Sequence, residues 1–281
     1  MARRVSLPES KLRRRRRVMR VRLAIVAGIG LVLLAGLVVG LSWLPIIRVQ
    51  SVDVSGAQSL STSTIENFAD AALKGRDLLV FPRDNIFFYP KKQIQSGLLS
   101  NFPELSSASV RAENFQTIEV AVAEREPAAL WCGQTADAAS DCRLMDASGF
   151  AYASDALLNE PSLVRYEGEA TTTKGYVSSL IPLQFLTPAE FKPLSALVSA
   201  LDQNQQAASI DEVEVDGSGD VHAHFSNGFT LLFALSDAGG DVFQRFTLAL
   251  ASEPFLNKTV GDFDYLDLRF GDKLYYKLKG K

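Results

Sequence analysis

The chain has 281 residues, of which 47% are hydrophobic, and a formal net charge of −3 from 29 Lys and Arg against 32 Asp and Glu. This composition excludes an intrinsically disordered protein, and the length allows two domains of modest size that each bury a core. The charge is unevenly distributed, because the first 22 residues carry ten basic residues and one acidic residue, a net charge of +9 that leaves −12 for the remainder.

A single membrane span is predicted directly after this basic segment. Five consecutive arginines, Arg13 to Arg17, are followed by an apolar run without charge from Leu23 to Leu41. At about 1.5 Å per helical residue, this run approaches the roughly 30 Å hydrocarbon core of a bilayer. We therefore predict a transmembrane helix within residues 23–47, with Trp43 as an interfacial anchor.

The basic residues also predict the orientation of the span. Because basic residues accumulate on the cytoplasmic side of membrane proteins, residues 1–22 are expected to be a cytoplasmic tail of a single-pass, type II protein. The 234 residues after Ile47 would then lie outside the cytoplasm. A cleaved signal peptide is the alternative, although the apolar run is long for one and Ser42-Trp43-Leu44-Pro45 is a poor cleavage site. A tail this short does not indicate nucleic-acid binding.

Residues 48–124 are predicted to form a small domain in the order strand, helix, helix, strand, strand. The segment 49–54 is rich in β-branched residues and predicts the first strand. Ser63 and Glu66 have the spacing of a capping box at the start of the first helix, and Gly75 suits its C-terminal end.

The second helix of this domain is predicted to begin at Pro90 and to end before Pro103, because proline is favoured in a first helical turn and stops a helix further on. Two strands, 107–113 and 117–124, are expected to pair as a hairpin.

Residues 125–281 are predicted to be a mostly antiparallel β domain with peripheral helices, which makes the chain an α+β protein. Thr187-Pro188-Ala189-Glu190 has the pattern of a helix start, but Pro193 is expected to interrupt the first turns, so we place the start of the main helix at Pro193. The other predicted elements are hairpins at 144–152 and 213–225, a strand at 229–235 after the turn Asn227-Gly228, a helix from Asp241 to about Ser252, and two final strands. Leu266, Leu268 and Phe270 are expected to share one face of the first of these strands, and Leu274, Tyr276 and Leu278 one face of the second.

Cys132 and Cys142 are the only cysteines, and nine residues separate them. The predicted topology places them in an oxidising compartment, which favours a disulfide that closes a short loop. Two reduced, buried thiols are the alternative. A zinc site is disfavoured because no histidine is near them in the sequence.

The sequence predicts no catalytic site, no metal and no cofactor. The only histidines, His222 and His224, lie two residues apart on one predicted strand face, which Glu212 and Glu214 share across the turn. A metal could bridge such a pair, but we interpret the face as solvated, with ordinary cross-strand charge pairs. The segment 216–220 begins like a calcium loop but lacks the required Gly and Glu, so it predicts a turn.

Several segments resemble the FtsQ/DivIB family of bacterial cell-division proteins. Segments similar to the end of its POTRA domain are Phe102-Pro103-Glu104-Leu105, Ala108-Ser109-Val110-Arg111, Thr117-Ile118-Glu119-Val120 and Glu124-Arg125-Glu126-Pro127. The stretch 52–57 resembles the opening of that domain, and 264–273 resembles the family's last strand pair. The order of basic tail, single span, POTRA domain and β domain is also that of the family. One departure is Gln116, where the family usually has proline.

The resemblance implies partners for both domains. The β domain of the family binds small single-pass coiled-coil proteins of the FtsB/DivIC and FtsL type partly by strand addition, and other membrane division proteins are implied partners of the POTRA domain. Because an edge strand presents unpaired N–H and C=O groups, we place the partner site on the last two strands. The candidate residues are Tyr265, Leu266, Asp267, Leu268, Arg269, Phe270, Tyr275 and Lys277. The alternative is that Tyr265 and Tyr275 only cover the outer face of the sheet.

These observations predict a non-catalytic membrane scaffold of the division septum that binds other division proteins and helps to regulate septal peptidoglycan synthesis. The alternative is a membrane-anchored enzyme outside the cytoplasm, such as a cell-wall hydrolase. A POTRA-bearing transport protein is disfavoured, because such proteins end in a long β-barrel that this chain has no room for.

Overall fold

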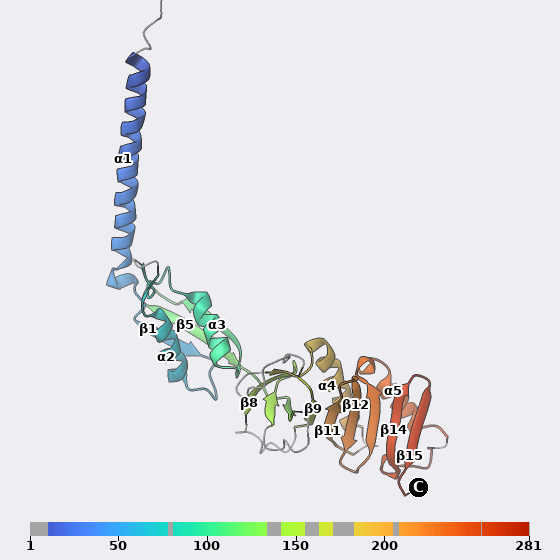
Figure 1. Ribbon diagram of the computed structural model, residues 1–281. Coiled ribbons are helices and arrows are strands. Elements are labelled where there is room, and N and C mark those ends of the chain that lie inside the picture. Colours follow the sequence, from blue (N-terminus) through green and yellow to red (C-terminus); the bar gives the residue numbers. More distant parts are fainter. Residues whose placement is uncertain are drawn as a thin grey trace, which may run out of the picture. The chain divides into compact units, whose positions relative to one another are not determined.

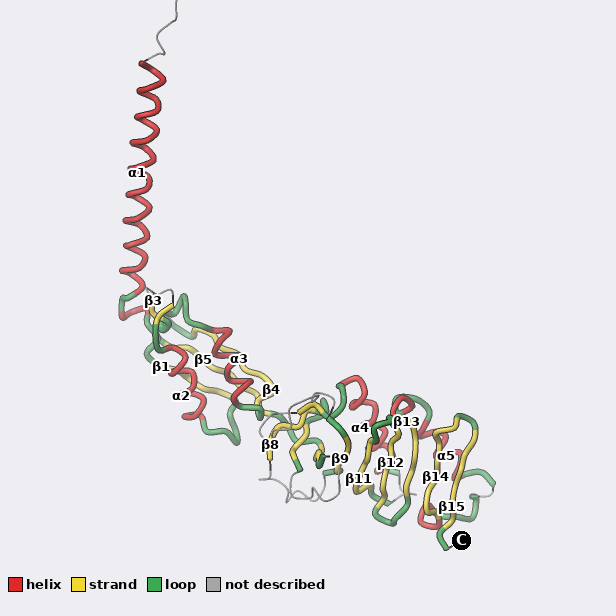
Figure 2. Tube along the Cα trace, viewed as in Figure 1, coloured by secondary structure: helices red, strands yellow, loops and turns green. Residues whose placement is uncertain are grey.

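The computed structural model describes residues 11–77, 81–133, 142–154, 163–170, 183–204, 208–253 and 255–280. These residues form a mixed α+β protein, as predicted, with five α-helices and large β-sheets. The chain divides into two compact units, Met1–Glu124 and Arg125–Lys281, whose elements can be followed in Figure 1 and Figure 2.

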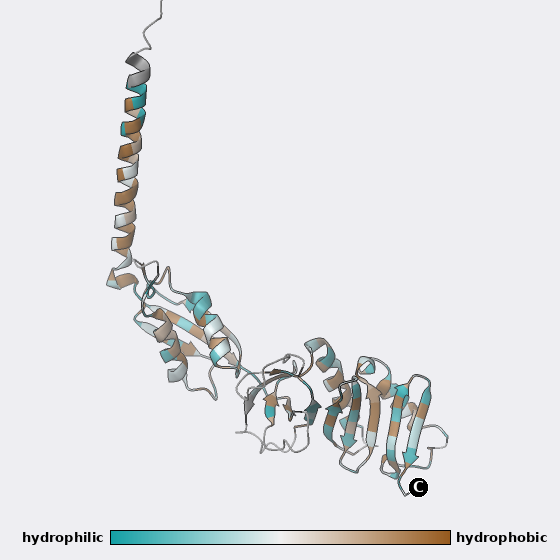
Figure 3. Cartoon of the chain, viewed as in Figure 1, coloured by the Kyte–Doolittle hydropathy of each residue, from teal (hydrophilic) through white to brown (hydrophobic). Residues whose placement is uncertain are grey.

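The N-terminal helix α1 (Lys11–Ser42) begins within the basic segment and continues through the apolar run. Its stretch Arg15–Ser42 is long and apolar enough to cross a membrane, and Figure 3 shows the change from hydrophilic to hydrophobic residues along it. The helix ends at Ser42 rather than at residue 47, because Pro45 has no N–H to donate and restricts the residue before it. Residues Pro45–Ile47 instead form the short 3-10 helix η1.

The remainder of the first unit is a three-stranded sheet that packs against two helices. Its elements are β1 (Ser51–Ser55), α2 (Thr62–Leu73), β2 (Arg76–Asp77), β3 (Phe81–Pro82), α3 (Lys91–Asn101), β4 (Leu105–Ala112) and β5 (Thr117–Glu124). The strand order is β1-β5-β4, with β1 parallel and β4 antiparallel to β5. Apolar residues of both helices and of the sheet form one core. The predicted strands and helices are therefore present, and the small β2–β3 hairpin is an addition to them.

The start of α2 differs from the prediction. Its N-cap is Ser61, and no capping box forms. The reason is that Ser63 lies already inside the helix, where its hydroxyl is hydrogen-bonded to that of Ser61 at 2.7 Å. At the other end, Gly75 has the positive φ of 106° that was expected after this helix.

The second unit is built on a ten-stranded sheet. Its strands are β6 (Ala129–Trp131), β7 (Arg143–Met145), β8 (Phe150–Ser154), β9 (Arg165–Gly168), β10 (Leu183–Gln184), β11 (Ile210–Val215), β12 (Asp220–Phe225), β13 (Thr230–Ala234), β14 (Phe263–Phe270) and β15 (Lys273–Leu278). The order is β10-β8-β7-β6-β9-β11-β12-β13-β14-β15. Most neighbours are antiparallel, whereas β6–β9, β9–β11 and β13–β14 are parallel. Helices α4 (Pro188–Asp202) and α5 (Val242–Leu250) share the large core of this unit with the sheet.

Two predictions in this unit were wrong. Helix α4 begins at Pro188 and not at Pro193, because Thr187 and Glu190 form a complete capping box that starts the helix one turn earlier and Pro193 is accommodated inside it. Phe270 does not share the buried face of Leu266 and Leu268. The register of β14 with β15 shifts between Asp267 and Phe270, and Phe270 is consequently exposed.

Candidate functional site

The candidate partner-binding site lies at one edge of the ten-stranded sheet. Strand β14 lies between β13, to which it is parallel, and β15, to which it is antiparallel. Strand β15 is the last in the strand order, so within the part of the chain that the structure describes it has one neighbour. Of the two predicted strands, β15 is therefore the one at the edge of the sheet, where main-chain groups are available to another chain.

The direction of these main-chain groups follows from the strand pairing. The N–H of Lys279 donates to the carbonyl of Asp262 at 3.0 Å, so the main-chain N–H of Lys279 points toward the β14 side. Main-chain groups alternate in direction along a strand, and both register shifts place their extra residues in β14, which leaves β15 regular. The N–H and C=O groups of Leu274, Tyr276 and Leu278 therefore point away from β14, toward the open edge.

The side chains of β15 divide between the two faces of the sheet. Leu274 and Leu278 pack against the core, and Tyr276 covers Phe255 and Phe263 with ring centroids 4.8 and 6.2 Å away. On the opposite face, the Tyr275 ring is exposed and contacts that of Phe270 edge to face at 5.2 Å. A partner strand beside β15 would thus meet an aromatic pair on the outer face.

Lys277 also lies on that outer face. Its Nζ is 2.6 Å from Oδ2 of Asp264, and this hydrogen bond raises the pKa of the lysine. Tyr265 pairs with Lys277 in the register and is half-buried.

Four of the eight predicted partner residues stabilise the sheet from within. Leu266 and Leu268 are buried in the core. The Asp267 carboxylate is also buried, and it accepts hydrogen bonds from Arg269 at 2.9 and 2.7 Å. Arg269 in turn pairs with Asp220 at the start of β12. Because these four side chains make contacts inside the unit, the predicted residues that remain exposed are Phe270, Tyr275 and Lys277.

The Arg269 cluster has a definite electrostatic effect. Burial alone would raise the pKa of Asp267, but the hydrogen bonds and the charge of Arg269 outweigh it and hold that pKa below its usual value. Hydrogen bonds to Asp267 and Asp220 raise the pKa of Arg269. Asp267 and Arg269 are therefore charged at neutral pH, and the ion pairs of Arg269 with Asp267 and Asp220 connect β14 to β12 across the intervening strand.

A second group of titratable side chains lies on the sheet face that the core does not occupy. As predicted, Glu212 and Glu214 share this face with the two histidines, and in the β11–β12 register Glu214 pairs with His222 and Glu212 with His224. One donor atom each from Glu214, His222 and His224 lies within 4.8 Å of the others. Nε2 of His222 is buried and has no hydrogen-bond partner among the described residues.

These three donors could hold a divalent ion such as Zn²⁺ only after rearrangement. A tetrahedral ion that binds nitrogen and oxygen at about 2.0–2.2 Å holds its ligand atoms about 3.3–3.6 Å from one another, whereas His224 Nε2 is 4.0 Å from Glu214 Oε2. His224 is already hydrogen-bonded through Nδ1 to Thr230 at 3.1 Å. Burial raises the pKa of neighbouring Glu167, and the negative charge of Glu212 adds to the effect. The segment 216–220 is a turn, as predicted, in which Asp216 accepts from the N–H groups of Ser218 and Asp220.

Cys132 and Cys142 are joined by a disulfide. Cys132 follows β6 and Cys142 precedes β7, so the bond links the ends of two paired strands. Both half-cystines are buried in a small core of their own with Leu130, Leu144 and Tyr152. Residues 134–141 of the loop lie outside the described residues.

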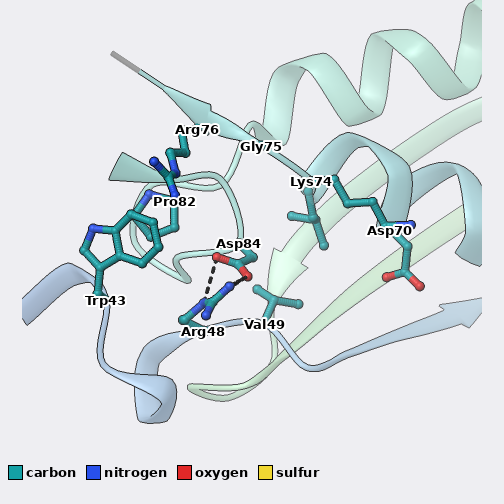
Figure 4. Close-up of a pocket in the computed structure, with 10 residues that line it drawn as sticks. Trp43, Arg48, Val49, Asp70, Lys74, Gly75, Arg76, Pro82 and Asp84 are labelled. Atoms are coloured by element: carbon teal, nitrogen blue, oxygen red, sulfur yellow. Dashed lines mark hydrogen bonds and ion pairs between the residues drawn. The ribbon is translucent and has the colours of Figure 1, made fainter. Parts of the chain in front are cut away.

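A cavity of about 420 Å³ that the sequence did not reveal lies in the first unit, next to the end of α1 (Figure 4). The Arg76 guanidinium lies 4.8 Å from the centre of the Trp43 ring, and that of Arg48 lies 6.0 Å from it. Arg48 also donates to both carboxylate oxygens of Asp84 at 3.1 and 3.0 Å, which raises the pKa of the arginine. Lys74 lines the same cavity.

No family model and no curated protein matches this chain.

Proposed function

We propose that the protein is a bitopic membrane scaffold of the FtsQ/DivIB type. In this proposal α1 spans the cytoplasmic membrane, residues 1–22 stay in the cytoplasm, and both folded units lie outside it at the division septum. The basic residues before α1 and its apolar stretch support the anchor and its orientation. The β1-α2-α3-β4-β5 succession with sheet order β1-β5-β4 supports a POTRA domain at 48–124.

The single observation that carries the proposal is the open edge of the ten-stranded sheet at β15. An edge strand with regular geometry accepts another strand through its main chain, and neighbouring side chains add selectivity. The proposed partners at this edge are FtsB/DivIC-type and FtsL-type coiled-coil proteins. By binding them, the protein would help to regulate septal peptidoglycan synthesis. Other membrane division proteins are proposed to bind the first unit.

The experiment that tests this function is imaging of a fluorescent fusion of the full chain in dividing cells of its own organism. A band at mid-cell during constriction is the expected result. A uniform signal along the envelope would contradict a role at the septum, even if the chain spans the membrane.

A membrane-anchored enzyme is the second candidate, and the proximity of Glu214, His222 and His224 is the observation that favours it. A His222→Ala/His224→Ala variant of the full chain separates the two functions. The scaffold proposal predicts normal division with this variant. Loss of division while the protein is still inserted and produced at the normal level would favour the enzyme.

A further inference from the structure

Beyond α1, five large apolar side chains among the described residues of the first unit are more than 40% exposed, although this part of the unit has its own core. Their exposed fractions range from 43% to 66%. They come from three separate segments and are Leu44, Ile46, Phe87, Phe88 and Phe115. We refer to these five residues as the membrane-proximal patch.

Direct contacts bring the three segments together at the end of α1. The side-chain amide of Asn85 donates to the carbonyl of Ser42, the last residue of α1, at 2.9 Å. The N–H of Ile86 donates to the carbonyl of Ile47 at 2.9 Å. The rings of Phe87 and Phe115 have centroids 6.4 Å apart. The hairpin tip that carries Phe115 is thus joined to the loop 85–88, and that loop is joined to the helix end.

The core of the unit does not account for these residues. In the same loop, Ile86 is buried in that core and Tyr89 packs against it, whereas Phe87 and Phe88 between them are exposed. A contiguous apolar surface on a folded unit usually marks a contact with another apolar phase. Here the surface is attached to the last turn of a helix that is apolar enough to cross a bilayer, so the nearest such phase is the bilayer itself.

The charges beside the patch fit the surface of a phospholipid membrane. Trp43 follows α1 directly, and tryptophan is enriched at the level of the lipid head groups. Arg76 lies over its ring, and Lys74 lines the adjoining cavity, as Figure 4 shows. Asp70 also lines this cavity, and Arg48 there is paired with Asp84, so Lys74 and Arg76 are the cations that remain for lipid phosphates. Apolar side chains beside cations are the composition of segments that lie in the interface of an anionic membrane.

We propose that the membrane-proximal patch is a second membrane contact, which enters the head-group and upper acyl region of the leaflet where α1 ends, with Lys74 and Arg76 on lipid phosphates. The inference rests on the proposed function, because it requires α1 to span the bilayer. The inference adds to that function a second attachment, because the folded part of the first unit would also contact the membrane surface instead of being held by α1 alone.

The test uses the full chain in vesicles of phosphatidylcholine with phosphatidylglycerol. Because the two native cysteines are joined to each other, a single introduced cysteine can be labelled selectively with the fluorophore NBD. The informative position is Phe87→Cys, with Phe88→Cys as a repeat. The matched control is Leu99→Cys, an exposed apolar position in α3 outside the patch, and Leu33→Cys reports on the span. Each label is exposed to lipids with a quenching doxyl group at acyl carbon 5 or 12 and to aqueous iodide.

The proposal predicts that the label at 87 or 88 is quenched at least twofold more by the 5-doxyl lipid than by iodide, while the label at 99 responds to iodide alone. The label at 33 should respond to the 12-doxyl lipid. If the label at 33 is quenched by lipid and the labels at 87 and 88 are quenched by iodide, the membrane contact of the patch is contradicted, whereas α1 still spans the bilayer. Protection of 87 and 88 from both quenchers would also overturn it, since a second protein copy would then cover the patch. No lipid quenching at 33 would overturn the anchor of the proposed function and this inference with it.

The cations are tested by Lys74→Gln/Arg76→Gln in the same labelled chain. In the parent, 5-doxyl quenching at 87 should rise with the fraction of phosphatidylglycerol. In the variant this dependence should be lost, and an unchanged dependence would overturn the role given to Lys74 and Arg76.

Discussion

The side-chain amide of Asn85 donates to the main-chain carbonyl of Ser42 at 2.9 Å, and this hydrogen bond joins the first folded unit to the end of α1. Asn85 is fully buried, and its side-chain oxygen accepts from the N–H of Phe87 at 3.0 Å. Asn85 thus bonds the last carbonyl of α1 and also a main-chain N–H of the loop that carries the exposed phenylalanines.

Replacing Asn85 should loosen this junction. Asn85→Ala leaves the Ser42 carbonyl and the Phe87 N–H without their partners, which costs about 1–3 kcal/mol for each buried group that stays unsatisfied. We expect faster amide hydrogen exchange in 85–88 in the full chain. Asn101→Ala is the control, because its side chain bonds only locally to Gly97 and Ser100. Equal exchange in both variants would contradict a joining role.

Gly56 is expected to tolerate no side chain. It has a φ of 87°, and an added Cβ would lie 2.0 Å from the carbonyl oxygen of Val122 in β5. Gly56→Ala should therefore destabilise the first unit by at least about 2 kcal/mol, measured as a shift in denaturant unfolding. The control Gly217→Ala has no atom within 4 Å of the new Cβ and should change stability by less than about 0.5 kcal/mol. A neutral Gly56→Ala would mean that β1 and β5 are not packed this closely.

Glu124 should make the stability of the first unit depend on acid pH. Burial alone would raise the pKa of its carboxyl, but the Ser59 hydroxyl and the N–H groups of Gln58, Leu60 and Ser59 hydrogen-bond to it and lower that pKa from 4.5 to about 2. A lowered folded-state pKa gives a stabilisation that is present above pH 4.5 and is lost as the pH falls toward 2. We expect Glu124→Gln to reduce stability at pH 7 and to flatten the dependence between pH 4.5 and 2. Parallel stability curves for the parent and the variant would contradict this role.

The disulfide should stabilise the second unit through its short loop. Replacing Cys132 and Cys142 together by serine is expected to lower the free energy of unfolding by about 3 kcal/mol, since the closed loop restricts the unfolded chain. Unfolding with and without a reductant gives the check. The parent should become like the variant when reduced, and a reductant should have no effect on the variant.

The sequence predicted the parts of the fold that local pattern determines. The hairpin predicted at 213–225 is present as β11 and β12, and its alternating residues Val213, Val221 and Ala223 are buried. The start of α4 was missed because a complete capping box at Thr187 outweighs a proline further along the helix. The ion pair of Arg269 with Asp220 could not be predicted, because 49 residues separate them. The exposure of Phe270 depends on a register shift between β14 and β15, which the local sequence pattern does not predict.

The sequence placed the candidate partner site on the last two strands, and binding of a partner there stays a prediction. The alternation of apolar and polar residues predicts which side chains of each strand share a face. Which of β14 and β15 lies at the edge depends on the strand order of the whole sheet. The loop 86–88 was overlooked for a similar reason. Its apolar run Ile86-Phe87-Phe88 is visible in the sequence, but its position beside α1 is a property of the tertiary structure.

The most direct test of the central claim compares Tyr276→Pro with Tyr276→Ala in the full chain. Both variants lose the ring that covers Phe255 and Phe263, but only proline also removes the main-chain N–H that points to the open edge of β15. The measurement is co-purification of the FtsB/DivIC-type protein of the same cells with each tagged chain. We expect the alanine variant to retain the partner. The amount of partner that co-purifies with the proline variant should fall at least tenfold. Equal recovery with both variants would show that no partner strand is added at β15.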